Sequence, residues 1–254
     1  MIHFITGLPR SGATMLSSIL TQNPDIHCEH SSALAEILKT INLNWNNFPS
    51  ASQDTGHPTK LGVLSGIIKG YYQHTDKPII LDNNKEWISS ISLLESILNE
   101  QVKILVCVRN PAEILTSFER SRKNNPLHFT NIDLELKQNS SIAARAFFYA
   151  GPDGVLGRAH RNINDAIIMG YLDRMLFIDY NRFCNSPKSQ TKRIYEFLKL
   201  PVYDHDFENI KQVDPFTKKI YNSPIARQTV NCVEYLGLDL YEQYNREIFW
   251  NAWV

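Results

Sequence analysis

The chain has 254 residues, and its 26 lysine and arginine residues balance 26 aspartate and glutamate residues, so the formal net charge is zero. Hydrophobic residues make up 43% and charged residues 20%, proportions that exclude long disorder, collagen-like repeats and coiled coils. Zero net charge argues against bulk binding to nucleic acid, which requires many Lys/Arg–phosphate contacts. We expect a single domain over residues 1–254.

Neither a membrane anchor nor a disulfide or metal framework is predicted. No apolar run approaches the ~18 residues of a membrane span, and the N-terminal residues lack the pattern of a secretory signal. The cysteines show neither CxxC pairing nor metal-ligand spacing; they are Cys28, Cys107, Cys184 and Cys232. We therefore expect a cytoplasmic protein without a metal or a membrane span.

Short apolar runs alternate along the chain with segments whose apolar residues recur at helical spacing. The apolar runs predict strands at residues 2–6, 78–82, 102–108 and 175–180. The helical spacing and the prolines predict helices at residues 13–22, 34–41, 61–72, 88–98, 111–123, 143–148, 154–171, 187–200 and 236–250. This order is typical of an α/β fold, a parallel sheet flanked by helices. Residues 124–172 are expected to hold a variable insertion, and residues 201–254 an irregular C-terminal segment.

A glycine-rich segment joins the first predicted strand to the first predicted helix. In this segment, residues 7–14, Gly7, Gly12 and Thr14 match the Walker A pattern, which indicates a P-loop NTPase-like sheet and an anion site at a helix N-terminus. Ala13 replaces the lysine that kinases and ATPases place on the β and γ phosphates, and Arg10 brings positive charge instead. A turn without a ligand remains an alternative.

The same segment resembles the 5′-phosphosulfate loop of sulfotransferases that use 3′-phosphoadenosine-5′-phosphosulfate (PAPS), which usually reads P-[RK]-S-G-[TS]-[TS]. The motif is most similar to the Golgi and bacterial kinds. Ala13 departs from the pattern, but its backbone N–H can still bind phosphate. The resemblance implies that the cofactor is PAPS and that the 5′-phosphosulfate is bound by Pro9, Arg10, Ser11, Gly12, Ala13 and Thr14.

Three further segments are similar to motifs of that family. Arg109-Asn110-Pro111, followed by Ser117, resembles its 3′-phosphate motif. Residues 81–87 resemble its D-K-x-R-x-W segment, although Asn83 stands where a lysine is often found and Lys85 where an arginine is common. Residues 179–183 resemble its Y-E-D-L stretch, where Tyr180 either touches the cofactor or packs in the core. Further candidate cations for the 3′-phosphate are Arg227, Lys218, Lys219, Arg120 and Arg122, of which Arg227 is preferred.

The resemblance also implies catalytic roles. Arg10 and Lys85 would stabilise the bridging and leaving oxygens, and Glu29, just beyond the first helix, would accept the proton of the acceptor. His30 is an alternative base because the pKa of an imidazole suits a base near neutrality. A third interpretation makes both residues part of a polar loop. Two histidines later in the chain, His128 and His160, are weaker alternatives.

The expected function is metal-independent in-line transfer of a sulfuryl group from PAPS to a hydroxyl or amine, with 3′-phosphoadenosine 5′-phosphate (PAP) as product. The acceptor partner would be a carbohydrate, a peptide or a small molecule. Two alternatives stay open: a kinase-like phosphotransferase with Thr14 and Asp82 as Mg²⁺ ligands, and a non-catalytic nucleotide-binding relative. The aromatic C-terminal segment could also support a homodimer.

Overall fold

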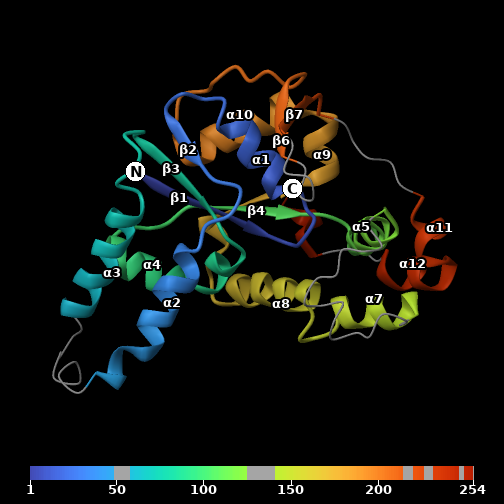
Figure 1. Ribbon diagram of the computed structural model, residues 1–254, viewed down its shortest axis with the longest axis horizontal. Coiled ribbons are helices and arrows are strands. Elements are labelled where there is room, and N and C mark those ends of the chain that lie inside the picture. Colours follow the sequence, from blue (N-terminus) through green and yellow to red (C-terminus); the bar gives the residue numbers. More distant parts are fainter. Residues whose placement is uncertain (49–57, 125–140, 214–219, 226–230, 246–248, 254) are drawn as a thin grey trace.

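Five parallel strands form the central sheet, in the order β2-β3-β1-β4-β5 (Figure 1). They are β1 (Ile2–Gly7), β2 (Ile26–Cys28), β3 (Ile79–Asn83), β4 (Ile104–Val108) and β5 (Met175–Asp179). The computed structural model describes residues 1–48, 58–124, 141–213, 220–225, 231–245 and 249–253. All four strands predicted from apolar runs are present. The sequence missed β2, because three residues are too few to form a recognisable apolar run.

Helices connect the strands and cover both faces of the sheet. The α-helices are α1 (Ala13–Leu20), α2 (Leu34–Asn44), α3 (Pro58–Tyr71), α4 (Ile91–Leu98), α5 (Pro111–Asn124), α7 (Ile142–Ala150), α8 (Val155–Ile168), α9 (Tyr180–Asn185), α10 (Pro187–Leu198), α11 (Cys232–Leu236) and α12 (Leu238–Tyr244). The 3-10 helices are η1 (Trp45–Asn47), η3 (Lys85–Ser89), η4 (Leu172–Arg174) and η5 (Phe249–Ala252). Among the described residues, none of these helices is both long and apolar enough to cross a bilayer.

The alternation of side chains along β4 divides the hydrophobic core into two clusters. Ile104, Val106 and Val108 pack with apolar residues of α2, α3, α4, α5, α7 and α8 on one face. Leu105 and Cys107 pack with α1 and α10 on the other face. Figure 1 shows α1, α9 and α10 above the sheet and α2, α7 and α8 below it. Burial on both faces explains why β4 is apolar throughout.

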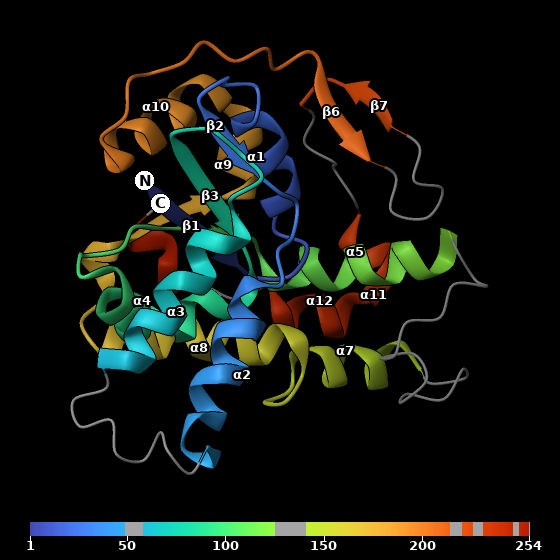
Figure 2. The same cartoon turned by 60° about the vertical axis from the view of Figure 1, so that its left-hand side comes forward.

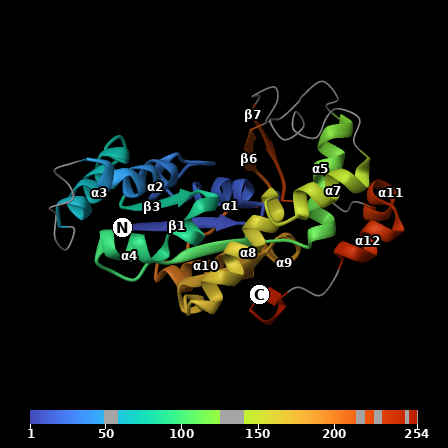
Figure 3. The ribbon, with the colours of Figure 1, turned by 90° about the horizontal axis from the view of Figure 1, so that it is seen from below.

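The C-terminal segment is more regular than the sequence predicted. It contains an antiparallel pair, β6 (Ile210–Val213) with β7 (Ile220–Ser223), and β6 packs against α1. Farther along, α11 and α12 lie against α5, as Figures 2 and 3 show. The predicted helix 236–250 is replaced by the shorter α12 followed by η5. Strands β6 and β7 are stabilised by tertiary contacts, which the local sequence pattern does not reveal.

The stretch expected to be an insertion contains two helices that support the sheet. Helices α7 and α8 lie close to the predicted positions, whereas the polar residues before them, 125–140, lie outside the described residues. Helix α8 packs against η3, the short helix that follows β3. It thereby holds in place the segment that carries Lys85.

Candidate functional site

The carboxyl ends of all five parallel strands meet at one edge of the sheet, where the structure has a cavity of about 630 Å³. This edge is where α/β folds bind ligands. The segment after each strand contributes to the lining, which consists of Thr6, Gly7, Leu8, Arg10, Ser11, Gly12, Ala13, Thr14, Met15, His30, Ser31, Glu36, Asn83, Asn84, Lys85, Glu86, Arg109, Ser117 and Tyr180.

The loop after β1 is tightly constrained by two glycines. Gly7 has φ +136°, and a Cβ there would lie 2.0 Å from the carbonyl oxygen of Cys107. Gly12 has φ +92°, and a Cβ there would lie 2.7 Å from Cδ2 of Tyr180. Both positions therefore require glycine on steric grounds as well as for backbone conformation. The loop can approach β4 and Tyr180 only because these side chains are absent.

The side chains of this loop divide into structural and cavity-lining groups. The Ser11 hydroxyl is buried and donates to the carbonyl oxygens of Leu8 (2.6 Å) and Cys107 (3.0 Å), so it is used to hold the loop. Pro9 is buried and does not line the cavity. Helix α1 starts at Ala13, and its cap residue Gly12 makes no side-chain hydrogen bond. The backbone N–H groups of the first helical turn, with the Thr14 hydroxyl, are thus suited to an anion.

Three cationic side chains converge on the cavity: Arg10, Lys85 and Arg109. Desolvation at the cavity wall and the charge of Arg109 lower the pKa of Arg10. Desolvation and the charge of Arg10 likewise lower the pKa of Lys85. Arg10 therefore repels both Arg109 and Lys85, and an anion that binds among these groups relieves this repulsion. The arrangement is suited to a ligand with several negative charges.

Arg109 is positioned by three different contacts. Its Nε donates to Oε2 of Glu113 at 2.8 Å, one turn along α5, and its Nη1 donates to the carbonyl oxygen of Arg10 at 3.4 Å. Its guanidinium lies 4.2 Å from the centre of the Tyr180 ring, a cation–π contact. Ser117, two turns into α5, accepts a hydrogen bond from Arg10 Nε at 3.0 Å. The strand end, the loop and α5 thus bring these side chains together.

The end of β3 supplies amides that the sequence did not assign to the site. Asn83 Nδ2 donates to Ser17 Oγ (3.1 Å) and to the carbonyl oxygen of His30 (3.0 Å). Asn84 Nδ2 donates to Oε2 of Glu36 at 2.7 Å. In this way Asn83, which stands where the resembled motif often has a lysine, ties the end of β3 to the segment after β2. Glu36 also lines the cavity, and the only sequence signal for it was its place as a polar residue on a predicted amphipathic helix.

Asp82, a suggested Mg²⁺ ligand in the kinase alternative, is buried and already bonded. Its carboxylate accepts hydrogen bonds from Ser32 Oγ (2.7 Å), Trp87 Nε1 (2.7 Å) and the Tyr72 hydroxyl. Burial raises the pKa of this carboxyl above its usual range. Asp82 does not line the cavity that contains Thr14. Its contacts suit a structural role and do not support metal binding beside Thr14.

The two base candidates lie in different places although they are adjacent in sequence. Glu29 does not line the cavity; its carboxylate faces His27 and His74, with Oε1 3.6 and 3.7 Å from their Nε2 atoms. His30 lines the cavity, and its Nε2 is 2.9 Å from Ser18 Oγ. Burial, followed by the charge of Lys211, lowers the pKa of His30. The structure thus removes the geometric support for Glu29 as the base.

Several other predicted residues lie away from the cavity or outside the described chain. Arg227, Lys218, Lys219 and His128 are outside the described residues. Arg120 and Arg122 are on α5 but do not line the cavity. His160 lies beside Trp250, with ring centres 5.8 Å apart, in a separate hollow next to α12. Of the predicted cations, the cavity therefore contains Arg10, Lys85 and Arg109.

Comparison with known proteins identifies relatives of this chain. The family model of the sulfotransferase domain matches residues 3–224. Protein-tyrosine sulfotransferase A of Caenorhabditis elegans is 24% identical over 243 residues, which cover 93% of this chain and 59% of that protein. The chain thus spans less than two thirds of the length of that curated relative.

Two solved structures show the same fold. The sulfotransferase domain from the curacin biosynthetic pathway has a TM-score of 0.54 and 15% identity, with 98% of each chain covered. The sulfotransferase domain of the Synechococcus PCC 7002 olefin synthase has a TM-score of 0.51 and 20% identity, with 80% of this chain and 74% of that chain covered. These likenesses confirm the predicted α/β architecture.

Proposed function

Because this chain belongs to the sulfotransferase family, we propose that it transfers a sulfuryl group from PAPS to a hydroxyl or amine acceptor. The observation that carries the proposal is the convergence of Arg10, Lys85 and Arg109 on one cavity beside the glycine loop. PAPS carries negative charge at both its 5′ and its 3′ end, and the cavity offers cations and backbone donors for both. When bound, PAPS supplies the sulfuryl group and a phosphate leaving group.

The loop and α5 would hold opposite ends of this ligand. The N–H groups at the start of α1, with Thr14, would bind the 5′-phosphosulfate, since helix N-termini favour anions. Arg109 and Ser117 would bind the 3′-phosphate, where a guanidinium forms charge-assisted hydrogen bonds. Glu113 holds Arg109 through a 2.8 Å ion pair and so orients it before the ligand arrives.

Arg10 and Lys85 would act on the reacting oxygens. Negative charge develops on the leaving phosphate oxygen as its bond to sulfur breaks, and preformed cations there lower the barrier. Lys85 is fixed through its backbone, because Thr6 Oγ1 donates to its carbonyl oxygen at 3.0 Å. Desolvation, and after it the charge of a neighbouring arginine, lowers the pKa of both cations, and the negative charge of the leaving group would stabilise their charged forms.

His30 would accept the proton of the acceptor. Its Nε2 is 2.9 Å from Ser18 Oγ, and in the tautomer in which Nε2–H donates to that oxygen, Nδ1 carries the lone pair that would take the proton. Its lowered pKa keeps the imidazole neutral, the form that a general base requires. Asn83 anchors the backbone of His30 and would keep the ring at the cavity.

A second hollow, of about 520 Å³, shares Glu36 and Glu86 with the wall of the cavity. It is also lined by Lys39, Arg158 and Arg161. We assign the acceptor to this hollow, because it shares two lining residues with the cavity and offers both donors and acceptors of hydrogen bonds. Such a lining suits a polar acceptor, a carbohydrate or a peptide, better than an apolar one.

Thermal unfolding in the presence of nucleotides tests this function. PAP should raise the melting temperature of the full chain, because a ligand that binds only the folded state stabilises it, and ATP with Mg²⁺ should not. Arg109→Ala should abolish the shift. Arg174→Ala is the matched control, since Arg174 pairs with Glu95 at 3.0 Å and does not line the cavity.

The other outcomes discriminate between the alternatives. A shift with ATP and Mg²⁺ alone would replace the proposal with a kinase-like phosphotransferase. A shift with PAP, but no transfer of sulfate from PAPS to any carbohydrate or peptide acceptor, would indicate a non-catalytic nucleotide-binding relative. No shift with either nucleotide would refute nucleotide binding at this cavity.

A further inference from the structure

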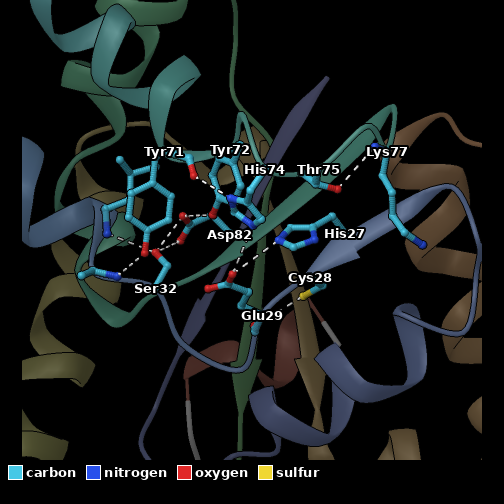
Figure 4. A network of polar contacts seen from close by, with 12 residues as sticks. His27, Cys28, Glu29, Ser32, Tyr71, Tyr72, His74, Thr75, Lys77 and Asp82 are labelled. Carbon is cyan, nitrogen blue, oxygen red and sulfur yellow. Dashed lines mark hydrogen bonds and ion pairs between the residues drawn. The ribbon is translucent and has the colours of Figure 1, made fainter.

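We propose that His27, Glu29 and His74 form a binding site for a divalent transition-metal ion of the Zn²⁺ class. The three side chains point toward one another beside β2, an edge strand of the sheet (Figure 4). One potential ligand atom from each residue lies within 4.8 Å of the other two. None of the three residues lines the cavity described above, so the site is separate from the proposed sulfuryl-transfer site.

The spacing of the strand residues places two ligands on one side of the chain. His27 lies within β2 and Glu29 just after its end, and residues two apart in an extended chain point to the same side. His74 approaches from the segment between α3 and β3. The Nε2 atoms of the two histidines are 3.6 and 3.7 Å from Oε1 of Glu29. A metal ion would therefore join two separate segments of the chain, since Glu29 and His74 are 45 residues apart (74 minus 29).

These separations suit ligands of a common ion better than direct hydrogen bonds. Both distances exceed the usual range for N–H···O contacts. Two ligand atoms of a tetrahedral ion with bonds of about 2.0–2.1 Å are about 3.3 Å apart. Small side-chain rotations would bring Glu29 and the two imidazoles to that separation.

A backbone contact prepares His74 as a ligand. Its Nδ1 is 3.0 Å from the carbonyl oxygen of Tyr71, and only a protonated nitrogen can donate to that acceptor. In the neutral ring, Nε2 then carries the lone pair, and it is Nε2 that faces Glu29. Metal-bound histidines commonly make such a contact through the other ring nitrogen, which fixes the ring and its tautomer.

His27 contributes a second, independent observation. Its Nε2 is buried and has no hydrogen-bond partner among the described residues. A buried polar atom without a partner is unfavourable, and coordination to a metal would satisfy it. Neighbouring rings hold the imidazole, since its centre is 5.6 Å from that of Tyr72 and 5.2 Å from that of His74.

The ligand set determines the class of ion. Two imidazoles and one carboxylate are a common set of protein ligands for Zn²⁺, with water in the fourth position. Ca²⁺ and Mg²⁺ prefer oxygen ligands and do not match two histidines. The His74 side chain is 51% exposed, so an ion can enter from solvent and retain a water ligand.

Calorimetric titration of the metal-free full chain with Zn²⁺ tests the site. The wild type should bind one equivalent, and His74→Gln and Glu29→Gln should each weaken binding by about tenfold or more, since even outer contacts of metal sites contribute that much. Co²⁺ should give the visible absorption of a four-coordinate ion without a thiolate charge-transfer band. The absence of that band would exclude cysteine as a ligand.

Matched controls separate loss of the site from loss of the fold. His160→Gln and Asp76→Asn remove a histidine and an acid that are outside the cluster, and both should bind Zn²⁺ as the wild type does. Without metal, His74→Gln should melt at the wild-type temperature, because the side chain is largely exposed. Equal Zn²⁺ affinity in the wild type and in both cluster variants, or no binding by the wild type, would overturn the proposal.

Discussion

Arg10 Nε donates a hydrogen bond to Ser117 Oγ at 3.0 Å, although the two residues are 107 positions apart. The bond links the loop after β1 to the second turn of α5 at the wall of the cavity. It places the hydroxyl of Ser117 beside Arg10, in the cavity that Arg109 also lines. A 3′-phosphate could accept hydrogen bonds from the hydroxyl and from Arg109, so Ser117 offers a specific test of how the nucleotide is oriented.

Ser117→Ala should weaken the binding of PAP by about tenfold to hundredfold, since a hydrogen bond to a charged group contributes about 1.5–3 kcal/mol. Binding of adenosine 5′-monophosphate, which lacks the 3′-phosphate, should change little. Isothermal titration with both nucleotides measures the difference. Ser96→Ala, in the exposed part of α4, is the matched control. Equal weakening for both nucleotides would place Ser117 away from the 3′-phosphate.

His30→Gln should lower kcat for sulfuryl transfer by about 10²–10⁴-fold, the usual contribution of a general base. Glu29→Gln should retain kcat within about tenfold, because its carboxylate faces His27 and His74 and not the cavity. Steady-state kinetics on both variants measures this. If Glu29→Gln is the inactive variant, Glu29 is the base after all and His30 only lines the cavity.

The pH dependence of kcat should carry the signature of His30. Burial and the charge of Lys211 lower the pKa of this imidazole. The acid limb of the kcat profile should therefore lie below pH ~6.5, the pKa of an unperturbed histidine. Activity should therefore fall as the pH drops below this range and the base becomes protonated. In His30→Gln the limb should disappear. A limb that persists in this variant would belong to another group.

Gly12→Ala should destabilise the chain by about 1–3 kcal/mol, because a non-glycine residue at positive φ is strained and its Cβ would lie 2.7 Å from the Tyr180 ring. Gly66→Ala, in the exposed middle of α3, should instead stabilise it by about 0.5–1 kcal/mol. A Cβ at Gly66 meets nothing within 4 Å. Urea unfolding measures both, and equal stabilities for the two variants would contradict the role of Gly12.

The free energy of unfolding should decrease as the pH falls, because folding lowers the pKa of His3. Burial, then the charges of Lys103 and of the N-terminus, lower its pKa from 6.5 to about 4. Between these values the unfolded chain binds a proton that the folded chain does not, so unfolding becomes easier as the pH falls. A shift of this size corresponds to about 3 kcal/mol, all of it present above pH ~6.5 and lost by pH ~4.

His3→Gln should remove this part of the pH dependence. Its free energy of unfolding, measured by urea at several pH values, should vary less with pH than that of the wild type. The quantity that reports on His3 is the difference in pH dependence between the wild type and the variant, because burial also lowers the pKa of His30, His160 and His205. Identical slopes between pH ~4 and ~6.5 would show that folding does not lower the pKa of His3.

Local pattern was sufficient for the four longer strands of the central sheet and for the glycine-rich loop after β1. A strand buried on both faces must be apolar throughout, as Ile104–Val108 is, so it stands out from the helices. The loop after β1 needs glycine where a Cβ would strike β4 or Tyr180, which leaves a recognisable spacing at Gly7 and Gly12. Family membership was predicted from such motifs, and the match over residues 3–224 confirms it.

Elements that depend on distant partners could not be predicted in this way. Strand β2 has three residues and exists because it pairs with β3, and β6 forms with β7 against α1. Neither segment has a hydrophobic period long enough to distinguish a strand from a loop. Their stability comes from contacts between segments that are far apart in the chain.

The sequence by itself determined which residue types were available for the site: the glycine loop, Arg10, Lys85 and Arg109. Only the tertiary structure decided which of two neighbouring residues, Glu29 or His30, lines the cavity. Successive residues of an extended chain point to opposite sides, so a shift of one position exchanges the two outcomes. Asn83, at the end of β3, donates to the carbonyl oxygen of His30 and so fixes the backbone of His30 at the cavity.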